Sequence, residues 1–298
     1  MCATAHIHPM NIVTKREHRM RTFTGPHTLY SFVMRQKRAG KRIGLVPTMG
    51  YLHEGHLSLI KKAHIDTDCV IVSIFVNPIQ FGQGEDLAAY PRNIARDKKL
   101  AKIAGADAVF IPSAESMYPP DYSVYVTERN LSKRWCGEHR QGHFTGVCTV
   151  VLRLFSVCAP DCAYFGQKDI QQALIIQKMA IDLFLPVSVV LCPIIREHDG
   201  LAMSSRNVYL SPSERLDALV LYKALTHAVA RFKEGIFSAG QLTGEMNAVI
   251  QTASSARIEY IACVDGKTLE PVETLSSGCR ILLAVRIGTT RLIDNILL

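Results

Sequence analysis

The fold of this chain is decided by the stretch Pro47-Thr48-Met49-Gly50-Tyr51-Leu52-His53-Glu54-Gly55-His56-Leu57. The short apolar run at residues 43–46 comes directly before it and is typical of a buried strand of a parallel sheet. After it, Leu57, Ile60 and Ala63 recur at the spacing of a helix that buries one face. The sequence therefore predicts a strand, a tight turn and a helix.

The turn carries residues suited to phosphate chemistry. Gly50 and Gly55 permit close approach of the backbone, and a helix that begins at or near His56 presents free N–H groups and its positive dipole end. Such a helix start binds phosphate. His53 and His56 can both face one oxyanion and stabilise the charge that develops on phosphorus during nucleotide transfer. The alternative is two histidines that lie near a helix start by chance, and the flanking strand and helix count against it.

Three further blocks follow in order, at residues 75–82, 164–172 and 203–207. Together with residues 47–59 they resemble the pantoate–β-alanine ligases, a family of the His-x-Gly-His nucleotidyltransferase superfamily. The resemblance extends from about Thr22 to Asn295, and four matching blocks are far more specific than any one of them.

The alternation of apolar strands and helices after the first turn predicts an α/β fold with a Rossmann-like, doubly wound parallel sheet. We expect a nucleotide- and pantoate-binding domain over residues 22–195 and a smaller C-terminal α/β lid domain over residues 196–298. Residues 1–21 are rich in His and Arg without hydrophobic periodicity and are expected to form a disordered extension. Met20 is an alternative initiator, and a mitochondrial leader is disfavoured because serine is nearly absent.

The resemblance implies ATP-dependent condensation of (R)-pantoate with β-alanine through a pantoyl adenylate, giving pantothenate, AMP and pyrophosphate. It also implies Mg²⁺ as the companion of ATP and a homodimer. His56 is the main catalytic candidate, with His53 and Lys168 beside it. Lys168 follows a predicted strand, where loops converge on ligands, and would act as a point charge on the phosphates.

Further residues are assigned by the same resemblance. Gln80 and Gln172 are expected to bind pantoate and β-alanine, since a buried amide can read hydroxyl and carboxylate groups. Ser204, Ser205 and Arg206 offer three donors to a triphosphate and its leaving pyrophosphate. The predicted ATP site comprises Met49, Gly50, Tyr51, Leu52, His53, Glu54, Gly55, His56, Gly166, Gln167, Lys168, Asp169, Ile195, Met203, Ser204, Ser205 and Arg206.

Several residues keep two interpretations. Asp97 is expected to be a surface carboxylate, although the resemblance allows it a place near magnesium. Asp169 can cap the next helix or orient Lys168 or a sugar hydroxyl. His143 is interpreted as structural. Gln141 and Gln167 stand where the family usually has proline and glutamate; the first loosens a turn, and the second is harmless if the contact is made by backbone atoms.

Three details of local structure are predicted. A helix capped by Asn93 should bury Ile94, Leu100 and Ile103. A capping box at residues 211–214 should start one helix that runs to Gly235. Residues 83–86 should form a flexible turn.

Composition limits the possible functions. A chain of 298 residues with 48% hydrophobic content can bury a core for two domains. Residues 1–42 hold nine Lys or Arg and one Glu, while the other 256 residues hold 25 basic and 25 acidic residues, so the net charge of +8 is confined to the N-terminus. The neutral body counts against nucleic acid as a partner.

The cysteines and the hydropathy indicate a compartment. Nine cysteines occur without a Cys-x-x-Cys pair, which is typical of reduced thiols in a cytoplasmic protein. No apolar run reaches the roughly 18 residues of a membrane span, and the N-terminus lacks a signal-peptide core. We therefore expect small-molecule substrates and no membrane.

Three other functions remain open from the residues alone. The chain could be a nucleotidyltransferase that leaves the nucleotide on its product. AMP formation only in the presence of both pantoate and β-alanine would distinguish the ligase from such a transferase. A tRNA synthetase fits less well, because the body lacks a basic excess and room for an anticodon domain. A catalytically silent nucleotide-binding regulator is disfavoured by intact His53, His56 and Lys168.

Overall fold

The computed structural model describes residues 20–298. The predicted extension, and with it the question of a leader, lies outside the described residues except at its end. The predicted extension, residues 1–21, overlaps the folded part at its last residue. Arg21 begins a short strand, β1 (Arg21–Phe23), that pairs in parallel with β4 (Ala108–Phe110).

The larger part of the chain is built on a six-stranded sheet with the order β1-β4-β3-β2-β5-β6. All five pairings in this sheet are parallel. The remaining strands are β2 (Ile43–Thr48), β3 (Cys69–Ile74), β5 (Cys162–Gly166) and β6 (Ser188–Cys192). The strand predicted at residues 43–46 and the strand predicted before Lys168 are confirmed as β2 and β5.

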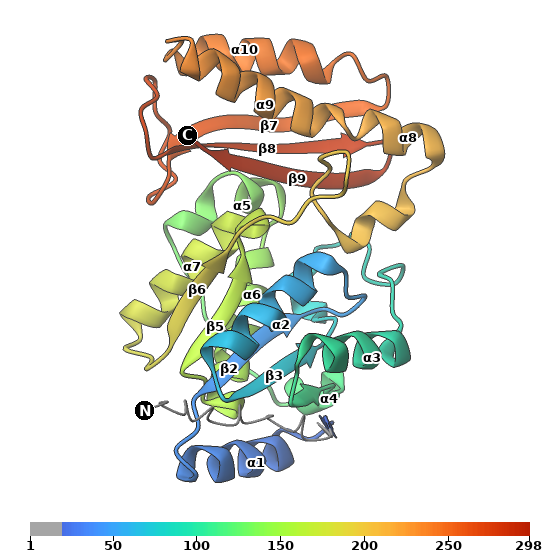
Figure 1. Ribbon diagram of the computed structural model, residues 1–298, viewed down its shortest axis with the longest axis vertical. Helices are drawn as coiled ribbons and strands as arrows, with labels where there is room; N and C mark the ends of the chain where they lie inside the picture. The colour runs from blue at the N-terminus through green and yellow to red at the C-terminus, as the bar shows by residue number, and fades with distance from the viewer. Residues whose placement is uncertain (1–19) are drawn as a thin grey trace, which may run out of the picture.

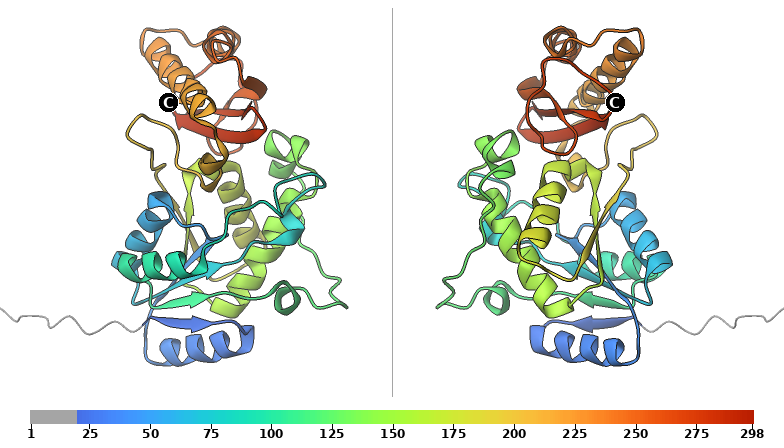
Figure 2. Two further views of the ribbon diagram at one scale, coloured as in Figure 1. Left: turned by 90° about the vertical axis from the view of Figure 1, so that its right-hand side faces the viewer. Right: turned by 90° about the vertical axis from the view of Figure 1, so that its left-hand side faces the viewer.

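Helices cover both faces of this sheet, as expected of a doubly wound fold (Figures 1 and 2). The helices α1 (Pro26–Arg38), α6 (His143–Cys158) and α7 (Ile170–Asp182) share one apolar core with Ile43 and Leu45 of β2. The helices α2 (Glu54–Asp66) and α3 (Ile94–Ala104) pack on the other face with Val46. The side chains of β2 thus alternate between two cores, because successive residues of a strand point to opposite faces.

A second, antiparallel sheet with the order β7-β8-β9 forms the C-terminal part and lies at the end of the molecule opposite α1 (Figure 1). Its elements are α8 (Pro212–Asp217), α9 (Val220–Lys233), α10 (Ala239–Ile250), β7 (Ala256–Asp265), β8 (Cys279–Ile287) and β9 (Thr290–Leu297). Ile281, Leu283 and Val285 of β8 face α9 and α10, whereas Leu282 packs with Ile170 of α7. The second sheet therefore rests directly on the first unit.

Short helical turns complete the connections. They are η1 (Pro78–Gln80), α4 (Ala114–Met117), η2 (Leu131–Lys133), α5 (Cys136–His139), η3 (Gln167–Asp169) and η4 (Ser205–Tyr209). Within residues 20–298, no helix is both long and apolar enough to cross a membrane.

Two predictions about helices were wrong. The capping box at Ser211 and Glu214 does start a helix, but α8 ends at Asp217 and α9 begins at Val220. The break changes the phase of the apolar stripe, because Leu216 is 69% exposed while Leu221 is buried.

The predicted inner face of α3 was wrong at two of its three positions. Leu100 packs against the core as expected, but Ile94 and Ile103 are 41% and 70% exposed, whereas Asp97, Ala101 and Ala104 are buried. The helix turns the Asp97 carboxylate inward, where it accepts hydrogen bonds from the backbone N–H groups of Tyr51 and Leu52.

Candidate active site

A cavity of about 210 Å³ opens at the carboxyl ends of the parallel strands. The turn after β2, the η1 turn after β3 and the η3 turn after β5 meet there, and the residues after β6 and the η4 loop close it from the C-terminal side. This is the edge at which open α/β sheets bind their ligands. The predicted site residues that line the cavity are Met49, His53, Gly55, His56, Gln80, Gly166, Lys168, Asp169, Gln172, Ile195, Met203, Ser204, Ser205 and Arg206.

The two histidines of the first turn are held by backbone N–H groups. The N–H of Gly55 donates to Nδ1 of His53 over 3.2 Å, and the N–H of His53 donates to Nδ1 of His56 over 3.3 Å. His53 is the N-cap of α2, so the two imidazoles form a capping box that satisfies free N–H groups of the helix start. Because Nδ1 accepts in both rings, each neutral ring carries its proton on Nε2.

Burial keeps both rings neutral. It lowers the pKa of His53 to about 4, with the charge of Lys168 acting in the same direction. Burial also lowers the pKa of His56 well below its ordinary value, assisted by His53 and Lys168. The ring centroids lie 4.0 Å apart, so two charged rings would repel strongly. The turn therefore presents two neutral N–H donors to the cavity.

We expect the free energy of unfolding to fall as the pH falls from about 6.5 toward 4. His53 binds a proton near pH 4 when folded but near pH 6.5 when unfolded, so the unfolded chain takes up more protons in this window. Burial lowers the pKa of His143 to about 3, which adds to the effect in the same direction. Each histidine contributes up to about 1.4 kcal/mol per pH unit.

Urea unfolding at pH 7 and pH 5, with NMR of the imidazole signals, measures this dependence. A titration of the His53 or His143 ring near pH 6.5 in the folded protein would contradict it.

The Asp97 carboxylate fixes the shape of the first turn. It accepts the backbone N–H of Tyr51 over 2.7 Å and that of Leu52 over 2.8 Å. Gly50 and Tyr51 have φ angles of +84° and +49°, a left-handed conformation that is unfavourable for the tyrosine. The prediction that Asp97 is a surface carboxylate was wrong, because the side chain is fully buried and compensates two N–H groups of a strained turn.

Asp97→Asn should lower the free energy of unfolding by about 1–3 kcal/mol, because the amide places a donor against one of these N–H groups. Chemical denaturation measures the change. Asp182→Asn, which alters a half-exposed surface ion pair with Lys178, is the matched control and should cost less than about 1 kcal/mol. Equal effects of the two substitutions would contradict the assignment.

Lys168 lies on the η3 turn, which the C-terminal sheet holds in place. Nδ2 of Asn295, a buried residue of β9, donates to the carbonyl oxygens of Gln167 (2.8 Å) and Lys168 (3.1 Å). Gln167 thus takes part through its backbone. Of the interpretations of Asp169, capping of the following helix was wrong: the side chain makes no capping bond, and its carboxylate lies 3.7 Å from Nζ of Lys168.

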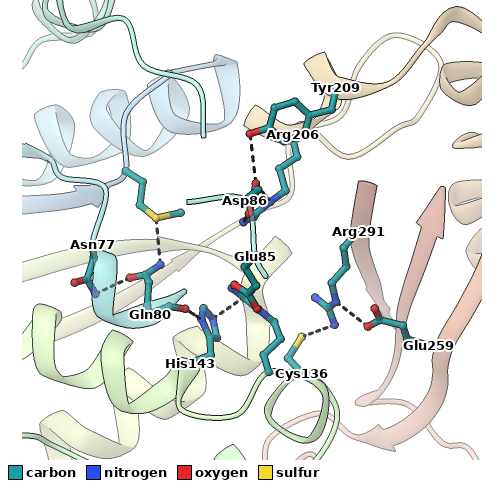
Figure 3. A network of polar contacts seen from close by, with 12 residues as sticks. Asn77, Gln80, Glu85, Asp86, Cys136, His143, Arg206, Tyr209, Glu259 and Arg291 are labelled. Carbon is teal, nitrogen blue, oxygen red and sulfur yellow. Dashed lines mark hydrogen bonds and ion pairs between the residues drawn. The ribbon is translucent and has the colours of Figure 1, made fainter. Parts of the chain in front are cut away.

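Two side chains contact the amide of Gln80, and Figure 3 shows one of them, Asn77. Nδ2 of Asn77 donates to Oε1 of Gln80 over 3.0 Å, and Nε2 of Gln80 approaches Sδ of Met49 at 3.2 Å. Gly146 permits α6 to approach this turn, since a Cβ there would lie 2.5 Å from the Ile79 carbonyl oxygen. The amide of Gln80 thereby presents a fixed donor to the cavity.

His143 lines the cavity, but both of its nitrogens are occupied. Nη1 of Arg140 donates to Nε2 over 3.0 Å, which leaves the proton on Nδ1 to donate to the Gln80 carbonyl oxygen over 2.8 Å. Its structural interpretation agrees with these contacts.

The η4 loop brings serines and an arginine to the cavity. Oγ of Ser205 donates to the Tyr51 carbonyl oxygen over 3.2 Å, which ties this loop to the first turn. Nε and Nη2 of Arg206 each bond to Asp86 over 2.8 Å, and the guanidinium lies over the Tyr90 ring at 5.6 Å. The segment 83–86, predicted to be a flexible turn, is instead anchored through Glu85 and Asp86.

Some predicted residues do not line the cavity: Gly50, Tyr51, Leu52, Glu54, Gln167 and Asp97. They belong to the turns around the cavity, except for Asp97, which acts through its hydrogen bonds to the backbone of the first turn. Glu54 points instead to Lys61, 3.7 Å away.

Residues that were not named as site residues from the sequence also line it, among them Asn77, Tyr90, Arg140 and Pro193. Asn77 directly follows the apolar strand β3, and that position was a usable signal.

Residues 21–297 match the family model described as pantoate-beta-alanine ligase. The chain belongs to the pantoate–β-alanine ligase family. A pantothenate synthetase from Heliobacterium modesticaldum is 52% identical over 276 residues, which span 93% of this chain and 98% of that protein. One from Thermotoga petrophila is 51% identical over 269 residues, or 90% of this chain and 95% of that protein.

Solved structures agree. Pantothenate synthetase from Thermus thermophilus superposes with a TM-score of 0.89 at 44% identity, covering 93% of this chain and 99% of that one. The pantoate–β-alanine ligase of Francisella tularensis, solved as a complex with "Beta-gamma ATP" and β-alanine, gives 0.78 at 34% identity over 93% and 97% of the two chains. The predicted fold class and ligase activity are confirmed, and the silent regulator and the tRNA synthetase are excluded as descriptions of this member of the pantoate–β-alanine ligase family.

Proposed function

We propose that this ligase condenses (R)-pantoate with β-alanine through a pantoyl adenylate, releasing pyrophosphate and AMP. The observation that supports this most is the pair of neutral imidazoles in the cavity, each with its Nε2–H set by a backbone hydrogen bond to Nδ1. Neutral donors beside the cation of Lys168 suit an oxyanion on phosphorus. Each neutral ring keeps its Nε2–H near neutral pH, so the donors do not depend on a titration.

In the first step a carboxylate oxygen of pantoate attacks the α-phosphorus of ATP, and the bond to the pyrophosphate oxygen breaks. His56 and His53 donate from Nε2 to the α-phosphate oxygens, and Lys168 offsets the charge as a point cation. Ser204 and Arg206 bind the β- and γ-phosphates, and Met49 and Ile195 contact the nucleoside. The hydroxyl of Ser205, which was expected to bind phosphate, instead donates to the Tyr51 carbonyl oxygen and holds the loop in place. These groups line one cavity, so catalysis is positioning plus charge stabilisation.

In the second step the amine of β-alanine attacks the acyl carbon. The acyl–oxygen bond breaks, AMP leaves, and the ammonium proton passes to solvent. Gln80 and Gln172 line the cavity and bind pantoate and β-alanine, and Asn77 fixes the Gln80 amide. The C-terminal part, from residue 196 onward, acts as the lid that excludes water from the adenylate.

Mg²⁺ is the proposed companion of ATP. Mg²⁺ is commonly held by substrate phosphates and one or two carboxylates, so the triphosphate oxygens would supply most of its ligands. Within residues 20–298 there is no group of three or more His, Cys, Asp or Glu that could hold a metal ion. Asp169 is the carboxylate among the residues that line the cavity and would complete the set. Asp97 does not fit this position, because both of its oxygens already accept backbone hydrogen bonds. When bound, the ion offsets phosphate charge.

A cytoplasmic location and a homodimer complete the proposal. Eight cysteines of the described chain are buried free thiols, as is typical of a reducing compartment. Light scattering of the purified protein measures the oligomeric state.

AMP release tests the proposed function. We expect ATP–pyrophosphate exchange that requires pantoate, and steady AMP formation only when both pantoate and β-alanine are present. A nucleotidylated product that accumulates without AMP release would favour the alternative transferase.

A further inference from the structure

Two adjacent carboxylates, Glu85 and Asp86, each bind an arginine that lines the cavity. Figure 3 shows both carboxylates and one of the arginines, Arg206. Glu85 binds Nε and Nη2 of Arg140 over 2.7 and 2.6 Å. Asp86 binds Nε and Nη2 of Arg206 over 2.8 Å each. Neither carboxylate is among the cavity-lining residues, so each binds its arginine from the side that faces away from the cavity.

The Asp86–Arg206 pair leaves one edge of the guanidinium free. A carboxylate bound to Nε and Nη2 uses two of the five N–H donors, so both donors of Nη1 and one of Nη2 remain. Since Arg206 lines the cavity and Asp86 does not, Asp86 is not a competitor that fills the phosphate position. The Tyr90 ring supports the guanidinium at 5.6 Å, and the Tyr209 hydroxyl donates to Asp86 over 3.3 Å.

The Glu85–Arg140 pair leads to the other end of the cavity. Arg140 donates to Nε2 of His143, and His143 donates to the Gln80 carbonyl oxygen. Glu85 therefore reaches the backbone carbonyl of Gln80 through the side chains of Arg140 and His143. Each contact in this chain is 3.0 Å or shorter.

Both carboxylates are ionised near neutral pH. Burial acts to raise the pKa of Glu85 and of Asp86, but the hydrogen bonds and charges of Arg140 and Arg206 outweigh it and lower both values.

We propose that Glu85 and Asp86 are positioning residues for the two ends of the active site: Asp86 aims Arg206 at the triphosphate, and Glu85 aims Gln80 at pantoate through Arg140 and His143. The inference rests on the proposed function.

The test is a split of kinetic constants in the full-length enzyme. Asp86→Asn removes the charge but keeps the shape, and should raise KM for ATP by roughly tenfold while KM for β-alanine stays within twofold. Glu85→Gln should raise KM for pantoate by a similar factor and leave KM for ATP within twofold. Asp121→Asn, an exposed carboxylate outside the cavity, is the matched control and should change neither constant.

A double-mutant cycle shows whether Asp86 acts through Arg206. Asp86→Asn combined with Arg206→Gln should raise KM for ATP no further than Arg206→Gln alone. Additive effects, a lower KM for ATP in Asp86→Asn, or equal changes in all three KM values with a lower thermal midpoint would overturn the inference. Failure of the unmutated enzyme to release AMP from pantoate and β-alanine would instead refute the proposed function.

Discussion

His56→Asn should lower the turnover number by about 10²–10³ and leave the fold intact. The side-chain carbonyl of asparagine takes the position of Nδ1 and can still accept the N–H of His53, so the capping box survives. What the substitution removes is the Nε2–H donor to the α-phosphate. Pantoate-dependent ATP–pyrophosphate exchange measures the loss in the step to which the donor is assigned.

His56→Ala separates the two contributions of this residue. It loses the donor and the cap, so it should match His56→Asn in turnover and lose about 1 kcal/mol more of the free energy of unfolding. If His56→Asn exchanged pyrophosphate at the normal rate, His56 would not be the catalytic donor.

Lys168→Met should lower turnover by about 10²-fold and raise KM for ATP, because it keeps the length of the side chain and removes its charge from the phosphates. The η3 turn should keep its position, since Asn295 holds it through the backbone oxygens of Gln167 and Lys168. Initial rates over a range of ATP concentrations give both constants.

Lys178→Met is the matched control, because this lysine makes a half-exposed ion pair with Asp182 on α7. It should change turnover by less than twofold. An unchanged turnover and KM in Lys168→Met would remove Lys168 from the mechanism.

Much of the architecture follows from local pattern. The apolar run before Pro47 and the helical spacing after His56 depend on residues next to one another, and both the strand and the helix form as expected. The placement of Gln80, Lys168 and Gln172 at one cavity also follows, because parallel strands end at the same edge of a sheet.

What could not be predicted depends on contacts between residues far apart in the sequence. Asp97 binds N–H groups 45 and 46 residues away, and no local pattern shows that α3 should turn a carboxylate inward. Arg206 lines the cavity, yet its partner Asp86 lies 120 residues earlier in the sequence. Buried hydrogen bonds of this kind overrule the apolar periodicity that would have placed Ile94 and Ile103 inside.

The central claim is that this cavity directs a pantoate carboxylate to the α-phosphorus of ATP. Pantoate labelled with ¹⁸O in its carboxylate tests it directly, with mass spectrometry of the products after a single turnover with ATP and β-alanine. We predict that one labelled oxygen appears in AMP, one remains in pantothenate, and none enters pyrophosphate. AMP free of label would contradict attack at the α-phosphorus and with it the assignment of His56 and Lys168.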